Sequence, residues 1–327
     1  MTTLSLSRRA LCIAAAFGPA ASFAQPAYPD KPVKLVVPWA PGGPVDAVAR
    51  AIAAGVGPRL GQPLIVENKP GASGTIGATL AASSAPDGYT IFVANVDTHV
   101  VNPLVIKNVR YKPVEGFDPI VEVGRLPMVI AVRTGLAARN VPELVKLAQS
   151  RPGGLSYGSW GQASVGHIAL AMLEQQAGVQ MVHVPYLGAA PALAALLGGQ
   201  IDMMIAQGSW AEQQAKAGKV QIIGMTSTRR SALYPAIPTV AEQGYPGYAA
   251  EQWVSLFVPK GVPAPVRARL NKEINAWLAT DKAQALLKDI GLEPTGGTPE
   301  QLAEHQKKEM ALWGAVVKAR SITSALE

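Results

Sequence analysis

The residues best placed to do chemistry lie in a Gly-Gly turn, in the stretch PWAPGGPVD at 38–46. An apolar run typical of a buried strand ends at Val37, and Val45 and Val48 recur at helical spacing after the turn. A glycine turn between a strand and a helix presents backbone N–H groups at the helix N-terminus, where an anion can bind. The stretch lacks the lysine of a phosphate loop and the three-glycine spacing of a dinucleotide site. We therefore expect a small carboxylate here; a tight turn that only needs glycine is the structural alternative.

The same order of strand, glycine turn and helix recurs near the middle of the chain, in LSYGSWGQASVGHIALAMLEQQAG. The strand ends at about Ser159, Gly161 lies in the turn, and a helix begins at about Ser164. Ligands of open parallel sheets bind beyond the carboxyl ends of the strands. Two such α/β units, hinged together, predict a ligand cleft between them.

Short β-branched runs alternate with helical stretches along most of the chain. We expect strands at 33–37, 64–68, 89–94, 128–133, 155–159, 181–184, 201–206, 220–225 and 253–258. Helices are expected at 45–59, 74–85, 141–150, 164–177, 189–198, 210–217, 263–279, 281–290 and 299–319. This alternation predicts an α/β fold with two domains, each a mostly parallel sheet covered by helices.

The first 24 residues have the pattern of a secretory signal peptide. Arg8 and Arg9 precede a short apolar run, and the small residues Ser22 and Ala24 precede the expected cleavage site. The apolar run is too short to span a membrane. We expect an exported protein, by either the general or the twin-arginine route.

Composition narrows the class of protein further. The single cysteine, Cys12, lies in the signal peptide, so the mature chain has no disulfide and no thiol nucleophile. Loss of Arg8 and Arg9 with the signal lowers the net charge from +7 to about +5. Because the basic residues are spread thinly, we expect no nucleic-acid partner. The four histidines are scattered, and we expect neither a metal site nor a cofactor.

Five motifs resemble one known family, the solute-binding receptors of tripartite tricarboxylate transporters, often called Bug proteins. The motifs, which extend over nearly the whole mature chain from about Tyr28 to about Glu304, are YPDKPVKLVVPWAPGGPVDAVAR, IVENKPGASGTIGA, PDGYTIFVAN, FDPIVEVGRLPMVIAVR and PTVAEQGYPGY. The resemblance implies a periplasmic receptor with a two-domain type II periplasmic-binding-protein fold. Such a receptor is not an enzyme. It captures a small organic acid, which can be aromatic or dicarboxylic, and delivers it to the subunits of a membrane permease.

The resemblance also implies where the chain crosses between the domains. Domain 1 is expected at 25–125 plus 250–327, and domain 2 at 126–249. The expected motion is closure of the two domains about hinges at the crossings, as in a Venus flytrap. We expect a monomer.

In this family the two strand–helix turns grip one carboxylate of the ligand. The corresponding residues here are Ala40, Gly42, Gly43 and Asp46 in domain 1, and Ser159, Gly161, Gln162, Ala163 and Ser164 in domain 2. Ser164 could add a hydroxyl donor. Asp46 cannot bind a carboxylate while it is ionised, so it is expected to cap the helix, fix the loop, or meet an amino or hydroxyl group of the ligand.

Further polar residues at strand ends are candidates for holding the distal part of the ligand. They are Ser73, Thr75, Asn95, Thr98, Gln207 and Ser209, with His99 as either a ligand contact or a hydrogen-bonded loop residue. The alternative is that these turns are purely structural.

Tryptophans lie at or next to three strand–helix turns, at Trp39, Trp160 and Trp210. Together they would suit a flat aromatic or long apolar acid through stacking and burial. The alternative is that they pack the domain faces. Trp277 and Trp313 lie in helical stretches near the C-terminus and are expected in the core.

Two other functions remain open at this stage. A loaded receptor could dock on a signalling protein, and the sequence does not separate that role from transport. A secreted hydrolase could use Ser164 and His167, which are three residues apart. No Gly-x-Ser-x-Gly elbow supports the hydrolase, so His167 is expected to pack beneath the turn or to donate into the loop. His183 is expected to be a hydrogen-bonded buried histidine.

Overall fold

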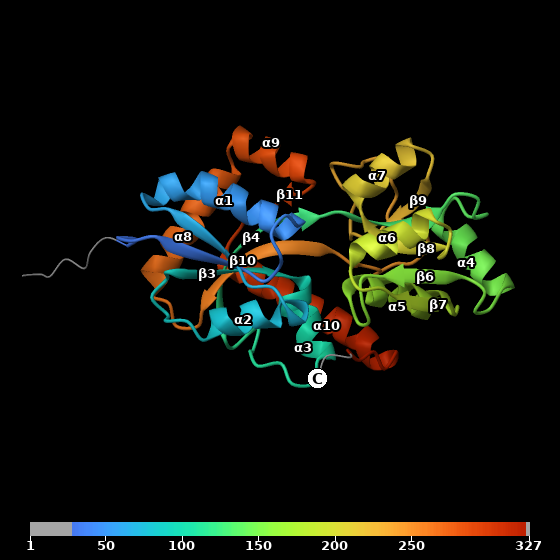
Figure 1. Ribbon diagram of the computed structural model, residues 1–327, viewed down its shortest axis with the longest axis horizontal. Helices are drawn as coiled ribbons and strands as arrows, with labels where there is room; N and C mark the ends of the chain where they lie inside the picture. Colours follow the sequence, from blue (N-terminus) through green and yellow to red (C-terminus); the bar gives the residue numbers. More distant parts are fainter. Residues whose placement is uncertain (1–27, 325–327) are drawn as a thin grey trace, which may run out of the picture.

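The computed structural model describes residues 28–324, so the predicted signal peptide at 1–24 lies outside the described residues. Two α/β domains lie side by side, each built around its own sheet with helices on its faces (Figure 1). The two-domain α/β architecture predicted from the sequence is therefore confirmed.

The first domain contains a six-stranded sheet in the order β11-β4-β10-β3-β1-β2. Its strands are β1 (Val33–Val37), β2 (Leu64–Asn68), β3 (Thr90–Asn95), β4 (Phe117–Leu126), β10 (Gln252–Pro259) and β11 (Glu293–Pro294). Its helices are α1 (Pro44–Leu60), α2 (Thr75–Ala82), α3 (Asn102–Val105), α8 (Ala264–Leu278), α9 (Asp281–Ile290) and α10 (Pro299–Ala319). Short helical turns, η1 (Ala72–Gly74) and η2 (Asp97–Val101), precede α2 and α3.

The second domain contains a five-stranded sheet in the order β7-β6-β8-β5-β9. Its strands are β5 (Met128–Arg133), β6 (Ser156–Ser159), β7 (Val182–Pro185), β8 (Met203–Gln207) and β9 (Val220–Met225). Its helices are α4 (Val141–Ser150), α5 (Val165–Ala177), α6 (Ala189–Leu197) and α7 (Gly208–Lys216), and a short turn, η3 (Ala241–Gln243), lies on the way back.

Most strands of each sheet run in one direction, as the alternation predicts. β1 pairs in parallel with β2 and β3, and β6 pairs in parallel with β7 and β8. Within each sheet one interior strand runs the other way: β10 is antiparallel to β3 and β4, and β5 is antiparallel to β8 and β9. The chain reaches each of these two strands from the other domain, at the edge of the sheet where the parallel strands end. Each strand therefore runs antiparallel to them.

The sequence pattern did not predict β4, although this strand is central to the first sheet. Pro119 interrupts its apolar run, and Glu122 and Arg125 occupy positions that an ordinary buried strand gives to apolar residues. The short elements β11 and α3 were also not predicted, because two and four residues carry no periodicity.

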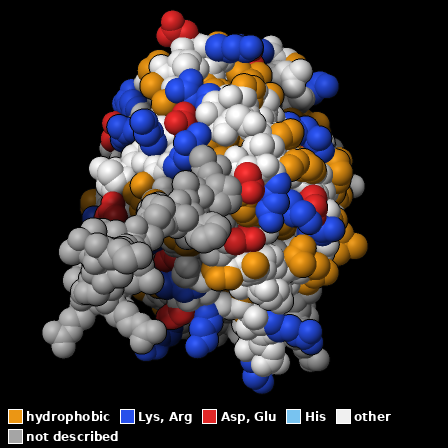
Figure 2. Space-filling view, turned by 90° about the vertical axis from the view of Figure 1, so that its left-hand side faces the viewer, with side chains coloured by type: hydrophobic (Ala, Val, Ile, Leu, Met, Phe, Trp, Pro, Cys, Tyr) orange, Lys and Arg blue, Asp and Glu red, His pale blue; other side chains and the backbone are white. Residues whose placement is uncertain are grey.

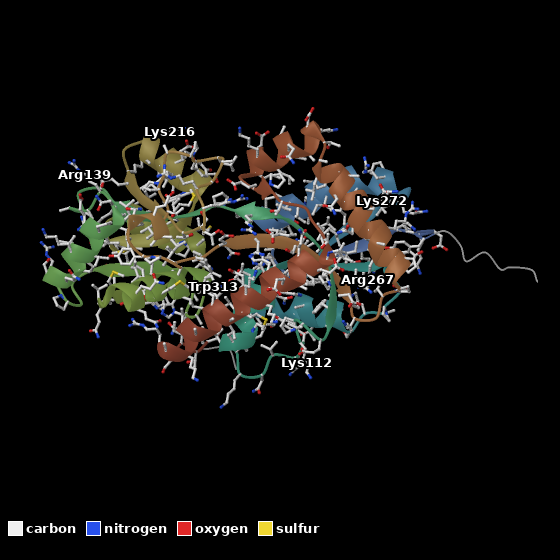
Figure 3. All side chains as sticks on the ribbon, turned by 180° about the vertical axis from the view of Figure 1, so that it is seen from behind. Lys112, Arg139, Lys216, Arg267, Lys272 and Trp313 are labelled. Carbon is white, nitrogen blue, oxygen red and sulfur yellow. The ribbon has the colours of Figure 1, made fainter. Side chains whose placement is uncertain are left out.

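Helix α10 joins the two domains on one side of the molecule. It packs on β4 of the first domain and on α5 of the second (Figure 3). Trp313 is fully buried in a core cluster that contains Phe92 from the first domain and Tyr157 from the second. Beyond it, Arg320 Nη2 donates to Glu174 Oε2 at 2.8 Å. The predicted core positions of Trp313 and Trp277 are confirmed.

Charged groups gather where the chain crosses between the domains, and we call Glu122, Arg125, Glu251, His305 and Glu309 the crossing cluster. Arg125 donates to Glu122 Oε1 at 2.7 Å and to Glu251 Oε2 at 2.5 Å. His305 Nδ1 lies 2.7 Å from Glu122 Oε2, and Trp313 Nε1 donates to Glu309 Oε2 at 2.9 Å. The cluster fastens α10 to both crossing segments.

Three members of the crossing cluster have raised pKa values, and two of them, Glu309 and His305, bear on the pH dependence of stability. Burial raises the pKa of Glu309 to about 7. Burial lowers the pKa of His305, but the hydrogen bond and the charge of Glu122 outweigh this, and the pKa of His305 is raised overall. Both groups therefore bind protons more tightly in the folded than in the unfolded protein.

Linkage gives the sign of the resulting pH dependence. A group whose pKa is raised on folding stabilises the protein below its unfolded pKa and loses that contribution as the pH rises through its folded pKa. For Glu309 the window runs from about 4.5 to about 7, and His305 acts in the same direction. Glu309→Gln removes one titrating group and keeps an acceptor for Trp313. We expect the loss of unfolding free energy between pH 5 and pH 8 to shrink by on the order of 1–3 kcal/mol.

Urea unfolding at pH 5, 6, 7 and 8 measures this change. Glu304→Gln, at an exposed position of the same helix, is the control and should leave the pH dependence unaltered. An unchanged pH dependence in Glu309→Gln would show that this carboxyl group does not titrate in the window.

Candidate functional site

The turn between β1 and α1 presents an uncapped helix N-terminus. Gly42 has φ +87°, a left-handed conformation that favours glycine, and Gly43 is the N-cap residue of α1. No side chain caps this helix, and Pro44 takes its first position. Helices α4, α5, α9 and α10 have a side-chain cap, whereas α2, α6, α7 and α8 share the uncapped start of α1. The N-terminal end of α1 faces the second domain (Figure 1).

Asp46 holds this turn in place from within α1. Its carboxylate is only 2 % exposed and accepts from Gly42 N at 2.9 Å, from Arg50 Nε at 2.9 Å and from Asn68 Nδ2 at 2.9 Å. Asn68 Nδ2 also donates to the carbonyl oxygen of Trp39 at 2.9 Å. Of the three roles considered for Asp46, the structure shows the fixing of the loop.

The hydrogen bonds keep Asp46 ionised. Burial raises its pKa, but the bonds from Arg50, Gly42 and Asn68 outweigh burial and lower the pKa below its usual value. The sequence analysis did not identify Arg50 or Asn68. The four-residue spacing of Asp46 and Arg50 was a usable signal for the first, because such pairs meet on one helix face.

The turn between β6 and α5 is held by neutral groups instead. The Ser159 hydroxyl donates to Gly161 O at 2.8 Å and lies 2.7 Å from His183 Nε2. The Ser164 hydroxyl also donates to Gly161 O, at 2.7 Å, and accepts from His167 N at 3.4 Å. Ser164 is thus the N-cap of α5, and its proton is used inside the turn. This corrects the expectation that Ser164 adds a hydroxyl donor for the ligand.

Ala163 adopts a left-handed conformation in this turn, with φ +59°. Its N–H donates to His167 Nδ1 at 3.1 Å, so His167 accepts a hydrogen bond from the loop and does not donate one. Because Ser164 bonds only to backbone groups and His167 Nδ1 bonds to Ala163, the two side chains do not form a nucleophile–base pair. The geometry does not support the hydrolase.

His167 and His183 stack face to face beneath this turn, with ring centroids 3.7 Å apart and planes 6° apart. Burial and the neighbouring His183 lower the pKa of His167 to about 3, and burial lowers that of His183 to about 4. Both rings are therefore neutral at neutral pH, which leaves Nδ1 of His167 free to accept. His183 is half-buried, so its predicted burial is only partly met, whereas its predicted hydrogen bond is present.

The turn after β3 buries the residues expected to reach a ligand. Asn95 and Thr98 are 5 % and 0 % exposed, and they bond to each other through Asn95 N to Thr98 Oγ1 at 3.2 Å and Thr98 N to Asn95 Oδ1 at 3.2 Å. His99 is fully buried against Phe257 and two further phenylalanines. The structure corrects the expectation that Asn95 and Thr98 reach a cleft, because both are buried and Asn95 Nδ2 donates to Asp97 Oδ2 at 2.8 Å. For His99 it shows the second alternative, a loop histidine whose Nδ1 lies 3.3 Å from Thr98 Oγ1.

The remaining polar candidates lie in two parts of the fold, at the start of α2 and beside the end of α9. Ser73 is exposed and Thr75 is half-buried at the start of α2. Gln207 and Ser209 lie instead against Gly291, the residue that ends α9. A Cβ atom on Gly291 would be 3.2 Å from Ser209 Oγ and 3.5 Å from Gln207 Nε2. These two side chains therefore contact the first domain beside α9.

Each of the three candidate tryptophans is half-buried and packs on a different part of the core. Trp39 lies near Gly74, where an added Cβ would be 3.6 Å from its Cζ2 atom. Trp160 covers Gly166, where an added Cβ would be 2.6 Å from the ring. Trp210 packs on the core of the second domain. Trp39 and Trp160 thus belong to the β1–α1 and β6–α5 turns, and both also pack a domain face.

Residues 28–324 contain no candidate metal cluster and no candidate membrane span. No group of three or more His, Cys, Asp and Glu side chains in this range could hold a metal ion. Within the same range, no helix is both long and apolar enough to cross a membrane. On the end of the first domain, basic side chains are interspersed with acidic and hydrophobic ones (Figure 2).

Two α/β domains, two chain crossings and a pair of strand–helix turns define the class of two-domain solute-binding proteins. The model of the tripartite tricarboxylate transporter family receptor matches residues 48–322, and the chain belongs to this family. The resemblance noted in the sequence is therefore confirmed. So is the expectation that the protein binds a solute and is not an enzyme, since the family consists of receptors.

Relatives and solved structures agree with this assignment. The chain is 38 % identical over 292 residues to a UPF0065 protein in the tcbD-tcbE intergenic region of Pseudomonas sp. strain P51, covering 89 % of this chain and 87 % of the relative. It is 30 % identical to BugT of Bordetella pertussis, covering 92 % and 93 % of the two chains.

Among solved structures, R. palustris Rpa4515 with adipate superposes with a TM-score of 0.80 at 33 % identity, over 91 % of this chain and 99 % of that one. The periplasmic binding protein BugD superposes with a TM-score of 0.76 at 37 % identity, over 91 % and 100 %. These matches cover both domains.

The hydrogen bond from Ala163 N to His167 Nδ1 predicts that His167→Asn and His167→Gln differ in their free energy of unfolding. Asn places its oxygen near the position of Nδ1, whereas Gln places its oxygen near that of Nε2. We expect His167→Gln to be less stable than His167→Asn by about 1–2 kcal/mol, because it leaves a buried N–H without an acceptor. Urea unfolding measures the difference.

Ala163→Gly, which removes the cost of the left-handed alanine, is the companion variant. It should recover part of the stability lost in His167→Gln. Equal stability of the Asn and Gln variants would contradict the role given to this hydrogen bond.

Proposed function

We propose that the protein is a periplasmic receptor that captures a small carboxylic acid between its two domains and delivers it to a membrane permease of the tripartite tricarboxylate type. The observation that carries the proposal is the uncapped N-terminus of α1 behind a turn that Asp46 holds fixed. Family membership and the adipate in the R. palustris relative support it.

The proposed ligand contacts come from the turn between β1 and α1 and the turn between β6 and α5. Backbone N–H groups of the first turn, including that of Gly43, meet the carboxylate together with the positive end of the α1 dipole. The second turn supplies a further donor from Gln162, whereas the Gly161 N–H donates to Ser159 Oγ at 3.3 Å within the turn. Preorganised neutral donors suit one charged carboxylate, because they do not need to reorganise when it arrives.

Closure about the two crossings is the proposed motion. The segments between β4 and β5 and between β9 and β10 are the backbone connections between the two sheets, and the proposed domain boundaries near 125 and 250 lie beside them. Closing the domains would exclude water from the carboxylate and strengthen each hydrogen bond to it.

A binding experiment with carboxylic acids tests the proposal. An acid present at 100 times its dissociation constant should stabilise the mature protein by about 2.7 kcal/mol, which raises the melting temperature measurably. The proposal does not survive if a broad panel of aliphatic and aromatic acids leaves the melting temperature of the folded protein unchanged.

Gly43→Ala tests the position of the carboxylate. Gly43 has φ −81°, which alanine adopts easily, and the added Cβ would lie 3.8 Å from Ala40 O. We expect stability to stay within about 0.5 kcal/mol, while affinity for the acid falls at least about 10-fold because a methyl group lies beside the donors. Titration calorimetry measures this, with Gly314→Ala in α10 as a distant control that should bind normally.

A further inference from the structure

The side-chain amide of Asn68 holds the backbone where the β1–α1 turn leaves its strand. Asn68 is the last residue of β2, and its Nδ2 donates to Trp39 O and to Asp46 Oδ1, both at 2.9 Å. Its Oδ1 accepts from Arg50 Nη2 at 3.3 Å. Both neighbours of Nδ2 are acceptors and the neighbour of Oδ1 is a donor, so only this orientation of the amide satisfies all three contacts.

This amide extends the pairing of β1 with β2 beyond the ends of both strands. The backbone ladder ends where Lys69 N donates to Val37 O at 2.7 Å. Trp39 lies two residues further along β1, where an extended chain turns its carbonyl group to the same side again. The Asn68 side chain thus supplies a bond that the backbone of β2 no longer supplies.

The bond to Trp39 O fixes the direction of the next N–H group. In a trans peptide the C=O and the N–H point to opposite sides, and Trp39 O and Ala40 N–H belong to the same peptide. Because β1 lies between β2 and β3, an N–H that points away from Asn68 points toward the end of β3. Ala40 is exposed, and no hydrogen bond among residues 28–324 uses its N–H.

The strand order of the first sheet reverses between β1 and β3. From β1 the chain passes through α1 to β2 on one side of β1, and then through α2 to β3 on the other side. Open parallel sheets bind ligands at such reversal points, beyond the carboxyl ends of the strands. The N–H of Ala40 therefore points to the part of the sheet edge where this class of fold binds its ligand.

The second domain has the same arrangement with a backbone donor. Tyr186 N, just beyond β7, donates to Ser159 O at 3.0 Å. Since β6 lies between β7 and β8, the N–H of Trp160, which shares a peptide with Ser159 O, points toward β8. The strand order reverses here too, and within the described chain no hydrogen bond uses Trp160 N–H. Each domain therefore directs one N–H group toward its own reversal point.

Few backbone donors remain in the β1–α1 turn. Three of its residues, Pro38, Pro41 and Pro44, are prolines and have no N–H. The N–H of Gly42 is already bound to the carboxylate that holds the turn. The direction of Ala40 N–H therefore matters for any anion that binds here.

We propose that Asn68 is a positioning residue of the carboxylate site. It directs Ala40 N–H at the ligand, and Trp160 N–H meets the same carboxylate from the second domain. The inference rests on the proposed function and adds these two donors to Gly43 and Gln162.

Selective isotope labelling tests the proposal on the unmodified mature protein. Trp39–Ala40 and Trp210–Ala211 are the only Trp–Ala pairs in the sequence, so ¹³C-carbonyl tryptophan combined with ¹⁵N alanine gives one signal for each pair. We expect at least one of acetate, adipate and benzoate to shift the Ala40 amide signal to a saturating value, which sodium chloride at equal ionic strength does not do. Ala211 is fully buried and serves as the internal reference.

The two proposals fail in different ways in this experiment. If one of these acids raises the melting temperature and leaves the Ala40 signal unmoved, the inference is wrong and the proposed function stands. If none of the three acids shifts the signal, the inference also fails. The proposed function fails only if the broad acid panel leaves the melting temperature unchanged.

Asn68→Ala tests the positioning role directly. We expect the carbonyl signal of Trp39 to shift, because this group loses its hydrogen bond. Affinity for the acid that binds should fall about 10-fold or more, because the N–H of Ala40 is no longer held in one direction. Titration calorimetry measures the affinity.

Asn271→Ala is the matched control. Asn271, in α8 of the same domain, is half-buried like Asn68, and its Nδ2 also donates to two acceptors, Ile120 O at 2.8 Å and Gly297 O at 2.9 Å. The control should lower the melting temperature and leave both the affinity and the Trp39 signal unaltered. Equal losses of affinity in the two variants, or an unchanged Trp39 signal in Asn68→Ala, would overturn the positioning role.

Discussion

The buried carboxylate of Asp46 is the interaction on which the candidate site depends. It joins the glycine turn, through Gly42, and the body of α1, through Arg50, to the end of β2, through Asn68, which lies 22 residues along the chain. Because Asp46 and Arg50 neutralise each other, the turn is held rigid without leaving a net charge next to the helix N-terminus. No side-chain carboxylate caps the N-terminus of α1, so the positive end of the helix dipole stays available to a ligand.

In the second domain, the turn between β6 and α5 is also held in place without a net charge, but by different groups. Ser159, His183 and His167 hold its turn through neutral hydrogen bonds and a stacked pair of rings. With pKa values of about 3 and 4, the two imidazoles keep one protonation state across the neutral range, so the geometry of this turn does not depend on pH there. Glu309, whose pKa is raised to about 7, and His305, whose pKa is also raised, belong instead to the crossing cluster.

Local patterns in the sequence predicted most elements closely. Strands 33–37, 64–68, 128–133 and 220–225 agree with the structure to the residue, because each is a short run rich in Val, Ile and Leu between turn residues. β4 was missed because Glu122 and Arg125 serve contacts with α10 and with the return crossing, which are distant in sequence.

The site was harder to predict than the fold, for a similar reason. The positions of the turns follow from local patterns, but the use of each side chain depends on partners far along the chain. Asn68 lies 22 residues from Asp46, and His183 lies 24 residues from Ser159. No pattern within one element shows that the hydroxyl of Ser164 is used by its own turn, or that Thr98 faces inward.

Helix α10 has a consequence for how the domains can move. Two backbone crossings alone define an axis about which one domain can swing freely relative to the other. The C-terminal helix adds a third attachment away from that axis, through Trp313 and the ion pair of Arg320 with Glu174. A body held at three points that are not in line cannot rotate without sliding at one of them. In the proposed closure, the end of α10 would have to slip along α5, so this contact would limit how far the domains rotate.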